Sequence, residues 1–342
     1  MKHKDSQAQP RAFLRRSGHL LRSIRAILGI DLFRFRGKTV LITGGSRGLG
    51  LILARKLAMK GAKLAIVARD DEELARAKKD LEQRGATVVA LKCDVREASQ
   101  IKSMVQAVTS KLGPIEVLIN NAGIITVGPL DVMTPEDFED AMKTHFWGAL
   151  QTTLAVLPGM RELGRGRIVN ISSIAGQIPA PHMLPYVASK FALTGLSQGL
   201  RAELLKDGIV VTTVCPGLMR TGSAFNAFFK GKHRAEFAWF MMVASSPLTS
   251  MNADRAARII LRAVRHGRAQ ITVTNQAKIA AKIMGLIPGL MTDRMGIIDR
   301  FLPEPNGIGD QKAKGFDSQS PLTQSFLTIL TQLAAKKNNE LP

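Results

Sequence analysis

Tyr186 and Lys190 are the residues of this chain best suited to proton transfer. Tyr186 is the only tyrosine, and Lys190 stands four residues later in a helix-like run, which puts both side chains on one helix face. A phenol titrates near pH ~10, and a neighbouring ammonium group stabilises its anion. Ser173, at the end of a predicted strand, could hydrogen-bond a substrate oxygen beside the phenol. We therefore expect Tyr186 to act as an acid and base, although each residue taken alone could be a buried phenol or a solvated charge.

A glycine-rich segment is suited to bind the phosphates of a dinucleotide. Residues 43–50 read TGGSRGLG and lie between a predicted strand and a predicted helix. Glycines there let the backbone turn tightly and approach a pyrophosphate, while the helix N-terminus offers free N–H groups and a positive dipole. The alternative is an ordinary strand-to-helix turn. We interpret the segment as a cofactor site formed by Gly44, Ser46, Arg47, Gly48, Leu49 and Gly50.

The elements that must position these residues alternate between strand and helix. Apolar, β-branched runs predict seven strands, at residues 39–43, 63–68, 87–92, 115–119, 167–171, 210–214 and 270–274. Helical patterns fill the gaps at residues 49–60, 72–83, 98–111, 135–157, 185–206 and 252–266. Such alternation predicts an α/β fold with a doubly wound parallel sheet, the Rossmann fold, over residues 36–275.

Residues 1–35 and 276–342 remain as N- and C-terminal extensions, and both are expected to be partly helical. Residues 276–302 are apolar and interrupted by Pro288. A last helix is expected at residues 322–337, with an apolar face formed by Phe326, Leu327, Ile329, Leu330 and Leu333.

In spacing and position these motifs resemble those of the short-chain dehydrogenase/reductase family, whose members are Rossmann-fold enzymes that use NAD(H) or NADP(H). The resemblance covers residues 37–275 and includes TGxxxGxG at 43–50, NNAG at 120–123 and YxxxK at 186–190. It also includes a serine thirteen residues before the tyrosine, CDV at 93–95, and PG at 216–217 with Thr221 beyond it. The chain is therefore predicted to be an NAD(P)-dependent oxidoreductase, and no metal ligands are predicted.

The resemblance also implies a role for each matching position. Lys190 would hold the nicotinamide ribose as well as lower the pKa of Tyr186. Other cofactor contacts would come from Asp94 and Val95 near the adenine, from Asn121, Ala122 and Gly123 after the fourth strand, and from Pro216, Gly217 and Thr221 at the nicotinamide carboxamide. The predicted reaction exchanges a hydride between the cofactor and a carbonyl or secondary alcohol, while Ser173 and Tyr186 bind the oxygen.

One position departs from the family pattern. Where the family has a catalytic asparagine, in the helix after the fourth strand, this chain has His145. In the family that asparagine helps hold a water that links the lysine to solvent. A neutral imidazole can also donate one hydrogen bond and accept another. His145 is thus either part of a modified proton relay or a packed core histidine, and the residue type alone does not decide between them.

The choice of cofactor depends on the end of the second strand. An acidic residue there would bind ribose hydroxyls and favour NAD(H), whereas an arginine would favour the 2′-phosphate of NADP(H). The acidic position falls on Ala68 and is followed by Arg69, and Arg47 adds a second guanidinium group. Asp70 and Asp71 would reverse this assignment if the strand ended two residues later. We expect NADP(H) rather than NAD(H).

The chain of 342 residues carries a net charge of +21, with a marked excess at its start. Residues 1–38 hold ten Lys and Arg against two Asp, and residues 13–28 have the pattern of a basic amphipathic helix. This helix could contact a membrane surface or pack on the main domain. Nucleic acid is a poorer partner, because aromatic residues are few and no recognised motif is present.

No stretch reaches the ~20 apolar residues of a membrane span, and two cysteines fit a reducing compartment. We expect a cytoplasmic protein, with peripheral membrane association as an open alternative.

Residues 218–248 would cover the substrate by analogy with the family. They include Phe225, Phe228, Phe229, Phe237, Trp239, Phe240, Met241 and Met242. These side chains suit an apolar substrate, such as a lipid, a steroid-like molecule or an acyl carbonyl, or else they pack as core or subunit contacts. A homo-oligomer is expected from the family. The competing function is a non-catalytic NADP-binding regulator or membrane-associated scaffold, which only His145 favours.

Overall fold

A seven-stranded parallel sheet forms the centre of the protein. The computed structural model describes residues 24, 32–325 and 328–341. The strands lie in the order β11-β7-β6-β4-β1-β2-β3, and each neighbouring pair is parallel. Their bounds are β1 Thr39–Thr43, β2 Lys63–Ala68, β3 Val88–Lys92, β4 Ile115–Asn120, β6 Gly166–Ile171, β7 Ile209–Cys215 and β11 Gln270–Thr272. The predicted Rossmann sheet is confirmed, and only the last strand ends more than one residue from its predicted position.

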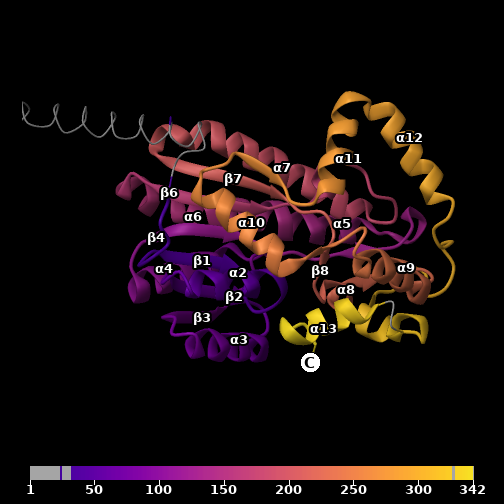
Figure 1. Ribbon diagram of the computed structural model, residues 1–342, viewed down its shortest axis with the longest axis horizontal. Coiled ribbons are helices and arrows are strands. Elements are labelled where there is room, and N and C mark those ends of the chain that lie inside the picture. The colour runs from indigo at the N-terminus through magenta and orange to yellow at the C-terminus, as the bar shows by residue number, and fades with distance from the viewer. Residues whose placement is uncertain (1–23, 25–31, 326–327, 342) are drawn as a thin grey trace, which may run out of the picture.

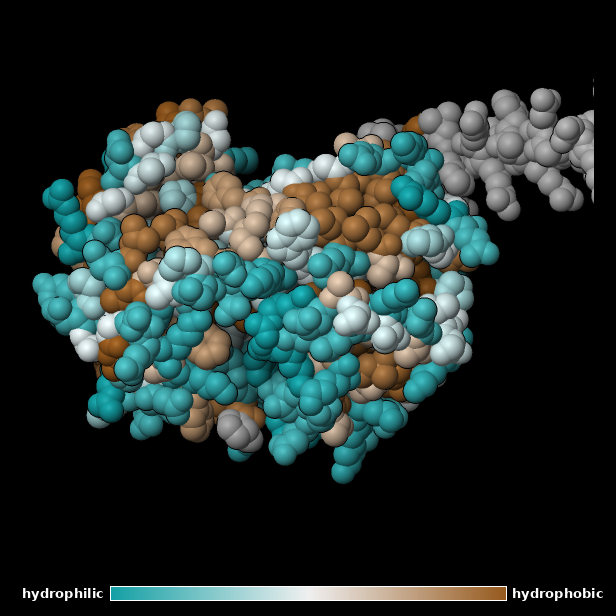
Figure 2. Space-filling view, turned by 180° about the vertical axis from the view of Figure 1, so that it is seen from behind, coloured by the Kyte–Doolittle hydropathy of each residue, from teal (hydrophilic) through white to brown (hydrophobic). Residues whose placement is uncertain are grey.

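Helices cover both faces of the sheet, and each face has its own apolar core (Figure 1). One layer contains α2 Gly48–Ala58, α3 Asp71–Gln83 and α10 Ala253–Arg265, and the other contains α4 Ala98–Leu112, α6 Gly148–Leu163 and α7 Leu184–Leu204. Successive strand side chains point to opposite faces, so Val40 and Ile42 enter the first core and Leu41 the second. Each such fully buried side chain stabilises the fold by roughly 1.5–3 kcal/mol. Figure 2 views the molecule from the side of α4, α6 and α7.

The strand order reverses beside β1, at the edge where the predicted site residues gather. β1 lies between β4 and β2, so the chain crosses to opposite sides of the sheet from this strand. The carboxyl ends of parallel strands meet at one edge, and a ligand crevice forms where the order reverses. Thr43 ends β1 and Asn120 ends β4, while Ser173 and Pro216 follow β6 and β7. The topology therefore brings the glycine-rich segment and the predicted catalytic residues to the same edge.

The predicted helix at residues 135–157 is interrupted, so that prediction was wrong as a single element. α5 Pro135–Met142 begins with a capping box between Thr134 and Asp137, with proline at its first position. A π-helical turn, η2 Lys143–Trp147, then joins α5 to α6. A π turn inserts an extra residue into the helix, and an apolar pattern with a period of 3.6 residues does not show where that residue enters. The turn carries His145 to a position that is only 1% exposed.

The C-terminal extension contains three α-helices in its described part. α11 Asn275–Leu286 and α12 Pro288–Asp299 project from the domain, and α13 Ile329–Lys337 lies against α9 His233–Ser245 (Figure 1). The helix predicted at 322–337 was wrong at its start, because only a 3₁₀ turn, Leu322–Gln324, precedes α13.

The apolar face predicted for this last helix was also wrong. Ile329, Leu330 and Leu333 are exposed, whereas Thr331 and Ala335 are buried. The small Ala335 packs closely against the backbone of Gly222, a contact that a leucine could not make. Phe326 and Leu327, which belonged to the same prediction, lie outside the described residues.

The predicted N-terminal amphipathic helix falls outside the described residues except for Ile24. Within the part of the chain that is described, no helix combines the length and the apolar composition needed to cross a bilayer.

Candidate active site

The structure brings Ser173, Tyr186 and Lys190 together at the carboxyl edge of the sheet. Tyr186 and Lys190 lie on the first turns of α7, and the Lys190 Nζ is 5.5 Å from the centre of the Tyr186 ring. The Lys190 ammonium donates a hydrogen bond to the carbonyl oxygen of Ile171, at the end of β6, with a length of 2.9 Å. Ser173 follows that strand and hydrogen-bonds the Tyr186 phenol. The four-residue spacing therefore places the phenol and the ammonium side by side.

Burial controls the protonation of this pair. It raises the pKa of Tyr186 above its ordinary value, and the hydrogen bond with Ser173 opposes that rise. Burial also lowers the pKa of Lys190 to about 7. A lysine lowers the pKa of a nearby phenol only while it is charged. Proton transfer by Tyr186 is therefore tied to the protonation state of Lys190 near neutral pH.

His145 contacts the same helix from the other side. Its Nδ1 lies 2.8 Å from the Ser189 Oγ, and its Nε2 accepts a hydrogen bond of 3.1 Å from the Ile124 backbone N–H. Because Nε2 accepts, the proton of the neutral ring sits on Nδ1 and is donated to Ser189, whose hydroxyl in turn donates to the Tyr186 carbonyl oxygen. Burial and the charge of Lys190 hold the pKa of His145 well below its ordinary value.

Both ring nitrogens of His145 are thus engaged by the protein. The ring packs edge-on against Tyr186, with centroids 5.4 Å apart. In this arrangement the imidazole fixes the segment after β4 against α7.

The glycine-rich segment makes a tight turn that only glycine can make at two of its positions. Gly44 has a φ of +62°, and a Cβ there would lie 2.9 Å from the Ala122 Cα. A Cβ at Gly50 would lie 2.0 Å from the Gly44 carbonyl oxygen. The Asn121 side chain donates hydrogen bonds to the carbonyl oxygens of Thr43 and Gly44, at 3.1 and 3.0 Å. The Asn121 side chain therefore stabilises the turn conformation of the glycine-rich segment.

Thr43 has a structural role at the site that was not predicted from the sequence. Its Oγ1 accepts hydrogen bonds from the backbone N–H groups of Asn121 and Ala122, at 3.0 and 3.1 Å, and so ties the ends of β1 and β4 together. Its position at the end of the first strand, before the glycines, was the available signal.

The end of β2 is the position that bears on the choice between NADP(H) and NAD(H). β2 ends at Ala68, and the exposed Arg69 follows. The two nearby aspartates are engaged elsewhere: Asp70 accepts from the backbone N–H of Glu73 and caps α3, and Asp71 pairs with Lys92 at 2.7 Å. Both acids therefore have partners within the chain.

Glu73 is a second residue that sequence reasoning missed. Its carboxylate pairs with the Arg47 guanidinium and accepts a hydrogen bond of 2.8 Å from the Ser46 hydroxyl. Two side chains predicted to bind the cofactor are thus joined to a carboxylate of the chain. Glu73 lies in the first turn of α3, where its negative charge also interacts favourably with the positive end of the helix dipole.

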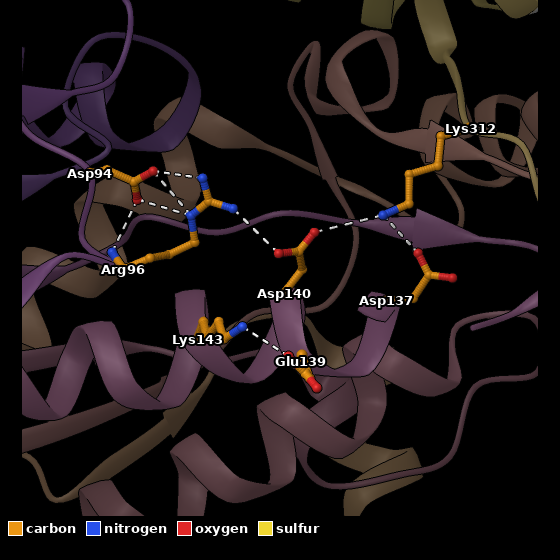
Figure 3. A network of polar contacts seen from close by, with 7 residues as sticks. All are labelled: Asp94, Arg96, Asp137, Glu139, Asp140, Lys143 and Lys312. Atoms are coloured by element: carbon orange, nitrogen blue, oxygen red, sulfur yellow. Dashed lines mark hydrogen bonds and ion pairs between the residues drawn. The ribbon is translucent and has the colours of Figure 1, made fainter. Parts of the chain in front are cut away.

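The predicted adenine-side residue Asp94 belongs to an ion-pair network (Figure 3). Asp94 pairs with Arg96 at 2.7 Å, Arg96 reaches Asp140, and Lys312 joins Asp140 to Asp137. Burial raises the pKa of Asp94, but the hydrogen bonds from Arg96 are sufficient to hold it below its ordinary value. The network connects the loop after β3 with α5 and with the C-terminal extension.

The remaining predicted contacts lie at the same edge. Val95 is buried and would meet a Cβ at Gly148 within 3.0 Å. The Pro216 carbonyl oxygen accepts a hydrogen bond of 2.7 Å from Ile174, and Gly217 packs tightly against Thr274. Thr221 is buried next to Gly222, and there the structure places residues 338–341, a segment to which the sequence analysis gave no role.

The fold and this site define the class of protein. The short chain dehydrogenase family model matches residues 38–228, and the chain belongs to the short-chain dehydrogenase/reductase family. The oxidoreductase SadH of Mycobacterium tuberculosis is 36% identical over 257 residues, which cover 73% of this chain and 92% of SadH. A ketoacyl reductase of Streptomyces coelicolor is 38% identical over 189 residues, 55% of this chain and 72% of that protein.

Solved structures agree with this assignment. A variant of actinorhodin polyketide ketoreductase with NADPH superposes with a TM-score of 0.64 at 29% identity, over 70% of this chain and 97% of the ketoreductase. A gluconate 5-dehydrogenase from Burkholderia cenocepacia, in complex with NADP and tartrate, gives a TM-score of 0.62 at 29% identity, over 73% and 98%. The protein is therefore an enzyme, an oxidoreductase that uses a nicotinamide cofactor. The tight turn that Gly44 and Gly50 permit fits that cofactor, since it leads directly into the N-terminus of α2, where the fold binds a pyrophosphate.

Proposed function

We propose that the protein is an NADP(H)-dependent oxidoreductase that interconverts a carbonyl and a secondary alcohol, with Tyr186 as the acid and base. The observation that carries this proposal is the set of buried Lys190 and half-buried Ser173 and Tyr186 at the sheet edge, next to the glycine-rich segment. A phenol with a hydroxyl and an ammonium group beside it has the composition needed to bind and protonate a developing alkoxide.

In the direction of reduction, each of these three residues has one task. The cofactor, when bound, supplies the hydride to the carbonyl carbon. Ser173 and Tyr186 hydrogen-bond the carbonyl oxygen, and the Tyr186 hydroxyl gives its proton to that oxygen as negative charge develops there. The charged form of Lys190 stabilises the phenolate that remains. His145 acts as a positioning residue, because its ring ties the Ile124 backbone to Ser189 on α7.

NADP(H) is the cofactor that we propose. The support is the end of β2 at Ala68, the exposed Arg69 after it, and the engagement of Asp70 and Asp71 by other groups. A guanidinium group recognises a phosphate dianion through parallel charge-assisted hydrogen bonds. Arg47 is a second candidate for this contact once it leaves Glu73.

The proposed substrate is an apolar or acyl carbonyl compound. Ketoacyl and polyketide reductases among the relatives support this choice. The aromatic residues at 218–248 give less support than their number promised, because Phe225, Phe229, Phe237, Phe240 and Met241 pack against one another in a small core of their own. Most of that set is therefore core, as the alternative interpretation held.

A projecting apolar arm supports contact with a membrane surface. In α11 only Ala277 is buried, and in α12 no residue is buried. The exposed side chains of the arm are apolar at Ile279, Ile283, Leu286, Ile287, Leu290, Ile297, Ile298 and Phe301, and basic residues stand among them at Lys278, Lys282, Arg294 and Arg300. Apolar side chains interspersed with cations suit an anionic lipid interface.

Self-association is proposed for a different face. Leu154 on α6 and Leu184 and Phe191 on α7 are 41–54% exposed, and Figure 2 shows a broad apolar patch over the layer that these helices form. An exposed apolar patch of this kind on a soluble domain marks an interaction site. We place the homo-oligomer contact there.

Tyr186→Phe tests the proposed function. The variant keeps the ring and loses only the acidic hydroxyl, so NADPH binding should be unchanged while turnover of a panel of apolar ketones falls by about 10²–10⁴-fold. Binding is followed by NADPH fluorescence and turnover by loss of NADPH absorbance. Near-normal turnover in the variant would remove Tyr186 from the mechanism. NADPH binding without turnover of any ketone or alcohol by the wild type would favour the non-catalytic regulator instead.

A further inference from the structure

The last described residues of the chain lie in the cofactor site. We call Asn338–Leu341 the C-terminal segment; it follows α13 and passes between the N-terminus of α2 and the Thr221–Asn226 stretch. The Gly48 backbone N–H donates to the Asn338 carbonyl oxygen at 3.0 Å. The Asn339 side chain donates to the Ser46 carbonyl oxygen at 2.9 Å. The segment therefore uses the backbone of the glycine-rich segment as its binding surface.

Glu340 occupies the innermost position. It is only 6% exposed, its carboxyl group accepts a hydrogen bond from the Gly222 N–H, and its carbonyl oxygen accepts one of 2.9 Å from Asn226. A Cβ added to Gly48 would lie 2.9 Å from the Glu340 Oε1, so the carboxyl group rests directly on the first turn of α2. The start of this helix, after a glycine-rich turn, is where the fold binds the pyrophosphate of a dinucleotide.

Residues outside the glycine-rich segment also hold the C-terminal segment in place. Arg55 on α2 donates to the Asn338 side chain and to the Lys337 carbonyl oxygen, both at 3.1 Å, and Arg76 on α3 donates to the Asn339 side chain at 2.7 Å. On the opposite side, Ala335 packs so closely that a Cβ at Gly222 would lie 2.4 Å from its own Cβ. Contacts on both sides hold the segment in one position.

The same closed arrangement also engages the arginine of the glycine-rich segment. Glu73 pairs with Arg47 and accepts from Ser46, while its carbonyl oxygen accepts a hydrogen bond of 3.0 Å from the Asn339 side chain. Asn339 thus bridges the glycine-rich segment and α3. Groups of the chain thus occupy the helix start that the pyrophosphate would need, and they engage Arg47, the second candidate for the 2′-phosphate contact.

We propose that the C-terminal segment is an autoinhibitory plug that competes with the dinucleotide for the glycine-rich segment and leaves the site when NADP(H) binds. This inference rests on the dinucleotide site of the proposed function. Two groups cannot occupy the same space at Gly48, so the cofactor binds only the fraction of molecules whose segment is released. The apparent dissociation constant then equals the intrinsic one divided by that fraction.

Two measurements on the full-length protein test the plug. The first is the NADPH affinity of the wild type, of Glu340→Ala, and of the matched control Glu304→Ala, which removes an equal charge from an exposed side chain of the same extension. We expect Glu340→Ala to bind NADPH about tenfold more tightly than the wild type, because the released fraction rises, and Glu304→Ala to bind like the wild type. The second is hydrogen exchange at residues 336–341, which should accelerate when the wild type is saturated with NADPH.

The outcomes separate this inference from the proposed function. Equal NADPH affinity in all three proteins, together with unchanged exchange at residues 336–341 on saturation, overturns the plug and leaves the dinucleotide site standing. Absence of binding of both NADPH and NADH to every form overturns the dinucleotide site and the plug with it. Binding by Glu340→Ala alone would support the plug in its strongest form.

Discussion

The burial of Glu340 should make NADPH binding depend on pH. Burial raises the pKa of the docked carboxyl group to about 8 from its ordinary value of 4.5; the charge of nearby Arg47 lowers this pKa and that of Glu73 raises it. The docked segment therefore keeps a proton that the released segment loses. Docking is strongest below pH 4.5 and is lost as the pH rises through about 8. Between these values the docking equilibrium weakens by up to about tenfold for each pH unit.

Glu340→Gln isolates this effect. Its amide resembles the protonated acid and does not titrate, so its docking should not change with pH. NADPH fluorescence titrations at about pH 6 and about pH 8 should show the wild type gaining at least about tenfold in affinity relative to the variant. Lys190 and the nucleotide phosphates titrate in both proteins, and the ratio of the two affinities removes their contribution. The same pH dependence in both proteins would refute the reasoning.

Three further predictions concern other parts of the molecule. Arg69→Ala should weaken NADPH binding by about tenfold or more and leave NADH binding unchanged, and equal losses for both cofactors in fluorescence titrations would contradict the assigned 2′-phosphate contact. Lys230→Ala should lower the unfolding free energy, measured in urea, by about 3 kcal/mol, because the fully buried Asp137 loses an ion-pair partner that lies 2.5 Å away. A loss below about 1 kcal/mol would show that Lys312 alone compensates the charge of Asp137. His145→Leu should cost about 1–3 kcal/mol, since it leaves the Ile124 N–H without its acceptor, and the pH profile of turnover should keep its shape, whereas the loss of one limb would place His145 in the proton relay.

The fold could be predicted because its signals are local. Parallel strands buried on both faces are rich in apolar residues, and β1, β2 and β4 are mostly apolar, with every side chain but those at the ends of β2 buried. The tyrosine and lysine could be placed because α7 is one unbroken helix, in which a four-residue spacing has a fixed geometric meaning. No residue pattern marks the π turn at His145, and this turn divides a helix that was predicted to be continuous.

The rest of the site could not be predicted because its contacts join residues distant in sequence. Asn338 meets Arg55 across 283 positions, and Asn339 meets Ser46 across 293. Residues 338–341, NNEL, read only as a mainly polar stretch, and nothing near them in sequence marks a partner. Glu73 looked like an ordinary acid in the first turn of a helix, because its pairing with Arg47 depends on β1 and β2 lying side by side.

The two carboxyl groups at this site bear on cofactor choice as well as on access. Glu340 lies on the helix start that a pyrophosphate would use, and Glu73 holds Arg47, which a 2′-phosphate could use. Either dinucleotide must displace Glu340, so that step does not distinguish NADP(H) from NAD(H). Only the 2′-phosphate carries a charge that can compete with Glu73 for the guanidinium group. A ligand without that phosphate leaves the Arg47–Glu73 pair intact, so a preference for NADP(H) requires phosphate contacts that are stronger than this ion pair.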